Sequence, residues 1–415
     1  MTYRVVLRRP EMKAVLGAHA ISLTGTVAAE VALSVLIYRR TGSPLLSALT
    51  LACAFVPQAF SAVLLSGLVD RVAPRRLLVT CDLACAVLVA CMVVPGTPVA
   101  VLLGLAAVIG LITPLFTGAR AATLADLLDD EAWVLARSLL RILSQSALLL
   151  GFAVGGLALV AIGPRSLLAL DAASFVASAG LLRFGTSMRP ARSRRPGALA
   201  RKGLAREGVA ATVRALRAPV LRRLLLMTWL PSTCLATLDG LATPYAGGRS
   251  VSIGLLLAAA ALGSVLAEVL GTRLRIASRP GLVRPVAALT GVALLGYALH
   301  PPIWVAVGLN LVGALGGAVG QALDQRLLAA LPTDGRGQVL ALQNGLLMAI
   351  QGAGIAVAGA LAEVASPSTV LTGAGVLDLL CVALLLRDGR REAPRDPRPQ
   401  TRRRTTQADP VVAPS

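Results

Sequence analysis

The chain has 415 residues, of which 56% are hydrophobic, and its formal net charge is +20. Its mean hydropathy of +0.77 excludes an ordinary soluble domain, because such domains stay at ~45–50% apolar residues. Many apolar stretches reach about 20 residues, the length of α-helix that crosses a ~30 Å hydrocarbon core. Strands of a membrane β-barrel instead alternate polar and apolar residues over ~10 positions. The composition therefore predicts an all-α membrane protein that crosses the bilayer several times.

In chain order, the apolar stretches predict twelve transmembrane helices in two halves of six. Proline-rich clusters at 95–98 and 300–302 mark tight turns between neighbouring helices. The longest connection separates the halves and gives an N-terminal half (1–185), a basic linker (186–219), a C-terminal half (220–386) and a disordered tail (387–415). The predicted helices cover residues 13–38, 45–69, 77–95, 98–119, 139–162, 165–185, 220–245, 250–272, 283–300, 302–324, 338–363 and 367–386.

The basic residues predict how this chain sits in the membrane. Of its 40 Lys and Arg residues, only four fall in odd-numbered connections, namely Arg39, Arg40, Arg165 and Arg249. The other 36 lie at the termini and in the even-numbered connections, and cytoplasmic loops are the ones that collect Lys and Arg. We therefore expect both termini in the cytoplasm, and the net charge needs no nucleic-acid partner. Within the linker, residues 204–217 fit either an amphipathic helix on anionic lipid or a plain basic connection.

Acidic residues inside the predicted spans are candidates for function. Glu30, Asp239 and Asp171 lie within apolar helices, where ionisable groups are costly and often carry ions or protons. The alternative for each is a structural pair or a helix-end position reached by water. Three glycines of the fifth helix, Gly151, Gly155 and Gly156, would let a neighbouring backbone approach closely. The six cysteines and two histidines form no metal-binding spacing, so we expect no metal or other cofactor.

The connection between the second and third helices resembles a known motif. The stretch S-G-L-V-D-R-V-A-P-R-R, residues 66–76, is similar to the loop G-x-L-A-D-R-x-G-R-K/R of the major facilitator superfamily, with Ser66 and Ala73 in place of glycines. The replacement of the second glycine by Ala73 resembles the drug:proton antiporter branch that includes macrolide-efflux pumps. The motif residues kept are Leu68, Asp70, Arg71, Arg75 and Arg76.

Other stretches resemble the same branch over almost the whole chain. Arg120 resembles its arginine at the end of the fourth helix, and residues 171–175 look like its "DAxSF". The run from Gly151 to Gly156 is similar to the antiporter motif G-P-x-x-G-G, with Phe152 replacing proline. Residues 22–26 lack the acid of the usual S-x-x-G-D. Because Glu30 lies one turn later on the same face, either it carries the proton instead or coupling differs.

The resemblance implies a secondary transporter of the bacterial inner membrane that exports a small lipophilic molecule in exchange for protons. It implies a monomer among lipids, whose halves rock around a cavity lined by the first, fourth, seventh and tenth helices. Asp70 would lock the halves together near residues 337–338. Cavity candidates are the polar and aromatic residues Phe116, Trp229, Asn310 and Gln145, although packing and interhelical hydrogen bonds explain such residues as readily.

Three alternatives remain open at this point. An importer or facilitator could use the same fold, and a transporter-like sensor could lack flux. A membrane-embedded enzyme could use Asp126-Leu-Leu-Asp-Asp130, since polyprenyl transferases hold magnesium diphosphate with similarly spaced acids. That chemistry needs a second acidic cluster, and none is evident in the sequence, so we expect a protein that is not an enzyme.

Overall fold

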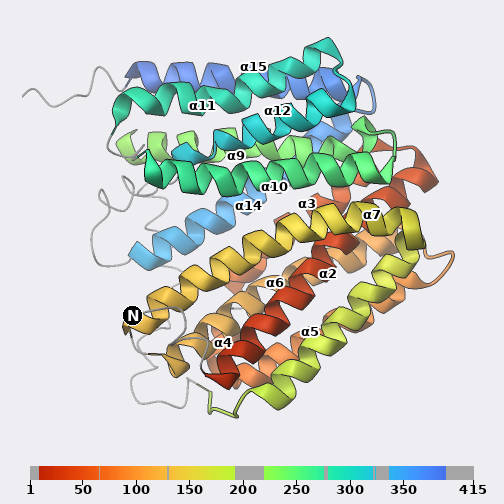
Figure 1. Ribbon diagram of the computed structural model, residues 1–415, viewed down its shortest axis with the longest axis vertical. Helices are drawn as coiled ribbons and strands as arrows, with labels where there is room; N and C mark the ends of the chain where they lie inside the picture. The colour runs from red at the N-terminus through yellow and green to blue at the C-terminus, as the bar shows by residue number, and fades with distance from the viewer. Residues whose placement is uncertain are drawn as a thin grey trace, which may run out of the picture.

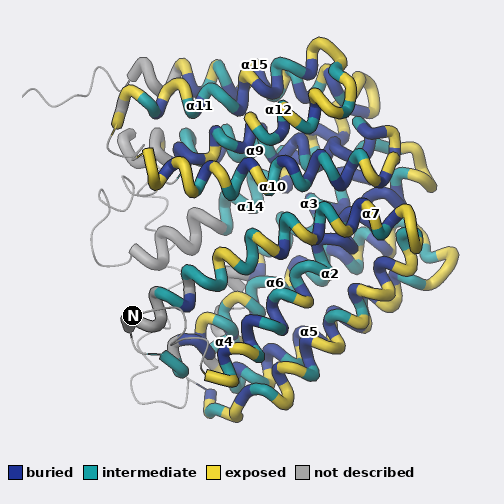
Figure 2. Tube along the Cα trace, in the orientation of Figure 1, coloured by how far each residue is buried: buried dark blue, intermediate teal, exposed yellow. Residues whose placement is uncertain are grey.

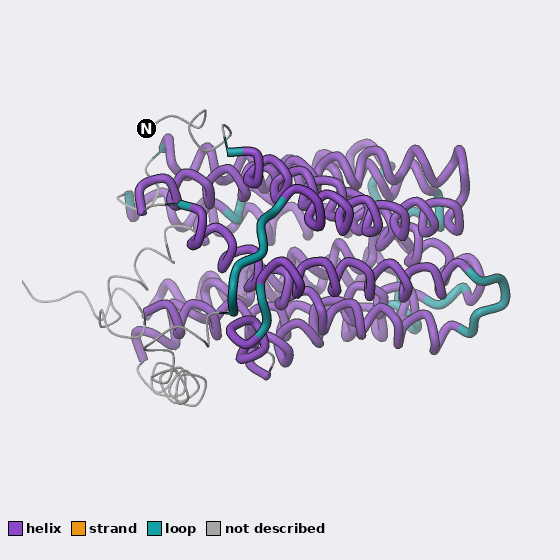
Figure 3. Tube along the Cα trace, turned by 90° about the horizontal axis from the view of Figure 1, so that it is seen from below, coloured by secondary structure: helices purple, strands orange, loops and turns teal. Residues whose placement is uncertain are grey.

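The computed structural model describes residues 9–64, 66–128, 130–191, 219–274, 279–320, 323 and 336–388. Within these ranges every regular element is a helix. The helices run from one end of the bundle to the other (Figure 3), and those of the first half slant against those of the second (Figure 1). The predicted amphipathic segment 204–217 and the tail beyond residue 388 lie outside the described residues. The all-helical architecture agrees with the fold class predicted from composition.

The first half consists of six elements. Proline opens both α2 and α5 at the first turn, where its missing N–H costs no hydrogen bond. The left-handed residue Gly42, with φ of 67°, ends α2 by donating its N–H to the carbonyl of Tyr38. These elements are α2 (Pro10–Thr41), α3 (Pro44–Leu64), α4 (Ser66–Arg71), α5 (Pro74–Val93), α6 (Val99–Leu127) and α7 (Asp130–Gly185).

α7 is two helical arms joined at Gly163. A straight helix of 56 residues would be about 84 Å long, far more than a bilayer needs. Gly163 instead adopts φ of 76° and ψ of 167°, which a residue with a Cβ rarely reaches. The chain turns back there, so the two arms run in opposite directions (Figure 1). The arms coincide with the predicted helices 139–162 and 165–185.

The second half lies beside the first, with α9, α10, α11, α12 and α15 grouped together in Figure 1. His300, with φ of 48°, and the following two prolines form the turn between η4 and α12. The elements are α9 (Pro219–Tyr245), α10 (Ser250–Arg273), α11 (Pro280–Leu295), η4 (Gly296–Leu299), α12 (Ile303–Leu315), α14 (Arg336–Leu361) and α15 (Pro367–Asp388).

The surface of the bundle is apolar, as lipid contact requires. Val154, Leu157 and Val160 on α7 are each more than half exposed, and exposed positions recur along α5, α7 and α10 (Figure 2). Eight helices of the described chain are long and apolar enough to cross a membrane, by length and composition, and two shorter apolar helices accompany them. These features define a multi-pass membrane protein. The count of twelve spans and the orientation of the termini stay predictions.

The two halves contact each other mainly through two helix pairs, α3 with α14 and α7 with α10. Small residues make these contacts close: Ala48 and Ala52 of α3 cluster with Ala236 of α9 and Ile355 of α14. Interfaces built from small residues depend on shape rather than on large apolar anchors.

Candidate functional site

The bundle has two distinct ends. α2 begins and α6 ends at the left of Figure 1, which the basic residues predict to be cytoplasmic. The α2–α3 turn, the bend of α7 and the α9–α10 turn lie at the right, which is the predicted outer end. We name the ends in this way below.

Hydrogen bonds between the halves hold the predicted outer end closed. The hydroxyls of Ser34 on α2 and Thr243 on α9 lie 2.8 Å apart, and both side chains are buried. The guanidinium of Arg39 donates to the carbonyl oxygen of Gly248 at 3.2 Å. Each bond joins residues 209 positions apart, so it links the two halves directly.

An exposed carboxylate adds a further contact at this end. Glu363, in the turn between α14 and α15, accepts hydrogen bonds from the hydroxyl of Ser43 and from the backbone N–H of Leu45, the latter at 3.0 Å. These bonds favour the ionised form, so they hold the pKa of Glu363 below its usual value. The carboxylate also meets the N-terminal end of α3, where a negative charge is favourable.

Glycines let α7 approach α2 and α10 closely. A Cβ on Gly151 would lie 2.8 Å from the Cβ of Val27 on α2, and one on Gly155 would lie 3.0 Å from the Cβ of Ala28. Gly156 faces the other half instead: a Cβ there would lie 2.7 Å from the Cα of Gly254 on α10. Gly156 therefore permits a backbone-to-backbone contact that closes the outer end.

A cavity of about 730 Å³ lies between α2, α6 and the first arm of α7. It is nearer the predicted cytoplasmic end, because the lining residues of α6 extend to Leu124 and those of α7 begin at Leu140. Among the residues the structure describes, no acidic side chain lines this cavity. The polar side chains that line it are His19, Ser22, Thr26, Thr113, Thr117, Arg120, Arg141 and Ser144.

Three polar side chains from different helices meet in the cavity wall. Nε2 of His19 on α2 lies 2.8 Å from the hydroxyl of Ser144 on α7 and 3.3 Å from the guanidinium of Arg120 on α6. Asp82 of α5 is fully buried nearby, and its Oδ2 accepts a hydrogen bond from Ser178 at 2.7 Å. A second, smaller pocket is lined by Asp82, His19 and Arg120 together.

The sequence pattern alone gives little emphasis to this group, because a lone histidine in an apolar helix usually packs against its neighbours and an acid near a helix end is usually reached by water. A usable signal was present in the sequence. His19, Asp82 and Arg120 each lie near the predicted cytoplasmic end of an otherwise apolar span, so all three share one depth. Polar groups at a common depth are expected to find each other inside a bundle.

Glu30 and Asp239, two of the predicted proton-coupling residues, occupy similar positions in the two halves. Glu30 continues the face of α2 that lines the cavity at Thr26, and Ser34 follows one turn later. Asp239 precedes Thr243 on α9 by the same four residues. Each acid is half-buried and lies one turn inward from the Ser34–Thr243 contact.

Asp171, the third acid, lies inside the first half. It is 2% exposed, accepts a hydrogen bond from Ser174 at 3.1 Å and packs against Gly25 of α2. Asp378 occupies the corresponding place in the second half, 207 positions later, where it is fully buried against Gly291 of α11. Asp171 and Asp378 are therefore enclosed within their own halves, away from the large cavity.

Of the four predicted cavity residues, Phe116 lines the large cavity. Trp229 is 5% exposed, and its indole N–H has no hydrogen-bond partner among the described residues. Gln145 is half-buried on α7 beside Ser144. Neither Trp229 nor Gln145 is among the described residues that line the large cavity.

Asn310 is fully buried in a hydrogen-bond network of the second half. Its side-chain oxygen accepts from the hydroxyl of Tyr297 at 2.6 Å, and its amide donates to the carbonyl of Leu256 at 3.1 Å. The amide thus ties α12 to η4 and α10. This placement favours the packing alternative for Asn310 over contact with a substrate.

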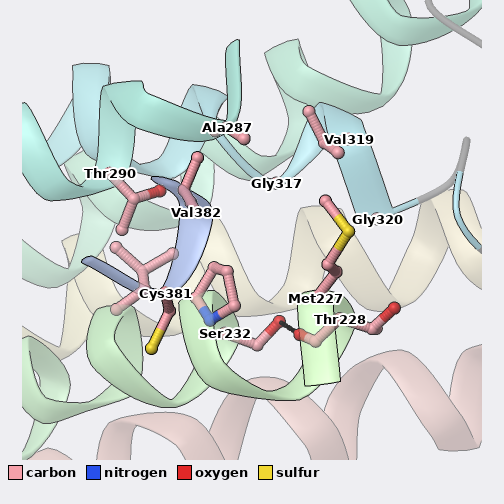
Figure 4. Close-up of a pocket in the computed structure, with 13 residues that line it drawn as sticks. Met227, Thr228, Ser232, Ala287, Thr290, Gly317, Val319, Gly320, Cys381 and Val382 are labelled. Atoms are coloured by element: carbon pink, nitrogen blue, oxygen red, sulfur yellow. Dashed lines mark hydrogen bonds between the residues drawn. The ribbon is translucent and has the colours of Figure 1, made fainter. Parts of the chain in front are cut away.

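A small pocket in the second half has a different character. It holds about 60 Å³ between α9, α11, α15 and the segment after α12, with Met227, Thr290, Gly317 and Cys381 among its walls (Figure 4). That volume suits a few water molecules rather than a solute. The larger cavity is therefore the better candidate for a substrate site.

The structure describes part of the motif at residues 66–76. Asp70 lies in α4, but its side chain is outside the described atoms. Arg71 ends α4, and Arg76 is exposed at the start of α5. Arg75 donates to the carbonyl of Arg183 near the end of α7, which fixes the α4–α5 turn to the first half.

One ion pair of the described chain joins the halves toward the predicted cytoplasmic end. The guanidinium of Arg141 on α7 contacts the carboxylate of Glu268 on α10. Arg141 is 63% exposed, so solvent weakens this pair.

Comparison with solved structures shows which proteins share this fold. A variant of the nucleoside transporter NupG aligns with a TM-score of 0.70 at 12% identity, covering 91% of this chain and 99% of that one. A bacterial homolog of the human lysosomal transporter Spinster, in an inward-facing and unoccupied conformation, aligns at 0.71 and 13%, covering 92% and 97%. The peptide transporter POT in complex with sulfate aligns at 0.68 and 15%, covering 91% and 94%. The fold is that of a major facilitator superfamily transporter.

The chain belongs to the transmembrane secretion effector family, whose model matches residues 5–410. A search of curated proteins with the sequence finds no match. The family and the similar solved structures are transporters of the major facilitator type and not enzymes. Among the described residues, no group of three His, Cys, Asp or Glu side chains could hold a metal ion.

Proposed function

We propose that this transporter exports a small lipophilic molecule in exchange for protons, by alternating access across the bacterial inner membrane. The observation that carries the proposal is the asymmetry of the bundle. Buried bonds such as Ser34–Thr243 join the halves at the predicted outer end, while a cavity of about 730 Å³ lies toward the other end. A state closed outside with a cavity inside is one of the two that alternating access requires.

Glu30 and Asp239 would carry the proton. They lie just inward of the outer contact, so separating the halves there would open both acids to the outside. An acid would take up a proton in that state and release it to the cytoplasm once the outer end closes again. Asp70 would hold the halves together at the cytoplasmic face during the outward-open state.

Transport by purified protein in liposomes tests the proposal. Compounds come from a panel that compares intracellular accumulation in deletion and overexpression strains. Efflux that accelerates when protons are more concentrated on the destination side supports antiport. Flux that is indifferent to the pH gradient would remove proton coupling and leave a facilitator. Substrate that moves in the same direction as the protons would favour the importer.

We also propose that the protein acts as a monomer among membrane lipids.

A further inference from the structure

Arg120 places a cation in the wall of the large cavity without an ion-pair partner among the described residues. A guanidinium offers five N–H donors and accepts nothing. Its one hydrogen-bond contact among the described residues is to Nε2 of His19, at 3.3 Å. The guanidinium can only donate, so this contact occupies one of its five N–H groups. The remaining N–H groups have no hydrogen-bond partner among the described residues.

The neighbouring charges leave Arg120 available to a ligand. Asp82 balances part of its charge, but Asp82 is fully buried behind the cavity wall, and no ion pair joins the two among the described residues. The other guanidinium that lines the cavity, Arg141, already contacts Glu268. Of the two arginines that line the cavity, Arg120 is therefore the one without an ion-pair partner among the described residues.

The rest of the lining is apolar with scattered hydroxyls. Phe116 and Phe175 contribute aromatic rings, and Thr113 and Thr117 contribute hydroxyl groups on α6. A volume of about 730 Å³ falls within the ~300–1,000 Å³ of pockets that enclose drug-sized ligands. An anionic group is the ligand chemistry that a guanidinium recognises best, because two parallel N–H bonds can reach it.

We propose that the cavity takes an amphipathic organic anion, whose carboxylate, sulfonate or phosphate binds Arg120 while its apolar part packs against Phe116 and Phe175. The proposal rests on the proposed function, because it assumes that this cavity is the transport site. It narrows the cargo from any lipophilic molecule to one with a negative charge at one end.

A matched set of probes tests the charge preference. Naphthoate, naphthamide and naphthylmethylammonium share one ring system and differ in charge. Their binding is measured at neutral pH to the protein in phosphatidylcholine nanodiscs, with empty nanodiscs subtracted. We expect naphthoate to bind roughly 10- to 100-fold more tightly than naphthamide, the range that a charged hydrogen bond provides. Equal binding of the three probes would overturn the proposal.

Variants locate the anion. Arg120→Gln should remove the preference for naphthoate, whereas Arg165→Gln, in the exposed turn at the predicted outer end, should keep it. Arg120→Lys keeps the charge without the planar fork, so it should retain a weaker preference even if the glutamine variant folds poorly. Phe116→Ala should weaken all three probes alike. A folded Arg120→Gln protein that still prefers naphthoate would refute the role of Arg120.

Two further arms separate this inference from the proposed function and from lipid binding. Loss of naphthoate binding in phosphatidylglycerol nanodiscs would refute a solute as the occupant of the cavity and identify a lipid headgroup instead. Proton-coupled flux restricted to cationic or neutral compounds would refute an anionic cargo and retain the proposed antiport. Arg120-dependent binding without flux of any compound would support the anion site and remove the transport function.

Discussion

Gly156→Ala should shift the transporter toward an outward-open state. Gly156 of α7 touches Gly254 of α10, and this contact joins the two halves at the predicted outer end. An added Cβ would lie 2.7 Å from the Cα of Gly254 and 3.1 Å from the carbonyl oxygen of Ser250. Both neighbours are backbone atoms, so no side chain can rotate away to make room.

The size of the effect follows from this overlap. Carbon atoms pack at ~3.5–4.0 Å, so the two helices would have to separate by about 1 Å. Forcing an extra methyl group into a packed contact costs ~1–3 kcal/mol. Because the contact exists only while the outer end is closed, the cost falls on that state alone. The ratio of outward-open to outward-closed protein should then rise roughly 5- to 150-fold.

Labelling of a buried position reports the shift. Thr243 is 2% exposed and forms the outer contact with Ser34, so a Thr243→Cys residue in a background without the six native cysteines reacts slowly from outside while that contact is closed. A membrane-impermeant maleimide applied to whole cells should label it faster in the Gly156→Ala protein. Folding is checked by thermal unfolding of the purified variants.

The neighbouring glycine provides a matched control. Gly155→Ala adds the same methyl group one residue earlier, but against Ala28 of α2 within the same half. It should lower thermal stability without changing the labelling rate. Unchanged labelling in a folded Gly156→Ala protein, or equal acceleration by Gly155→Ala, would refute the assignment of this contact to the outer closure.

Three further predictions concern other contacts. Glu363→Gln should raise external labelling of the Thr243→Cys residue by a few-fold at neutral pH. In the parent protein two hydrogen bonds lower the pKa of Glu363, so the closed outer end is favoured above the usual pKa of a glutamate and is weakened as external pH falls through the lowered value. A Gln variant whose labelling has the same pH profile as the parent would refute this role. Asp70→Asn should insert and fold yet lose most transport in liposomes, and near-normal flux would leave the motif a topological signal only. Asn310→Ala should cost ~2–4 kcal/mol in urea unfolding, because the hydroxyl of Tyr297 and a backbone carbonyl lose their buried partner; a loss below about 0.5 kcal/mol would contradict that network.

Local features of the chain were readable in advance. Proline-rich clusters marked the turns at Gly96 and His300, because these residues favour or permit backbone conformations that end a helix. The glycines of α7 indicated close packing, because a missing side chain has that consequence whichever helix is opposite. What they could not indicate is the identity of that helix: Gly155 meets the same half and Gly156 meets the other.

The cavity residues show the same division. Phe116 lies in the large cavity, whereas Asn310, a similar prospect on sequence grounds, is bonded inside the second half. Both are isolated polar or aromatic groups in apolar helices, and their roles differ through the rotation of each helix about its own axis. That rotation is fixed by packing against neighbours far away in the chain, so periodicity alone does not supply it.

Hydropathy, charge asymmetry and turn residues act over short stretches of chain, so they predict the membrane location, the helical architecture and the resemblance to a transporter superfamily. Which side chains meet depends instead on how the whole chain packs. His19 and Arg120 are 101 positions apart, and Ser34 and Thr243 are 209 apart, so neither contact follows from local pattern. The packing of α2, α6, α7 and α9 brings them together, and with them the cavity and the closed end on which the proposed transport depends.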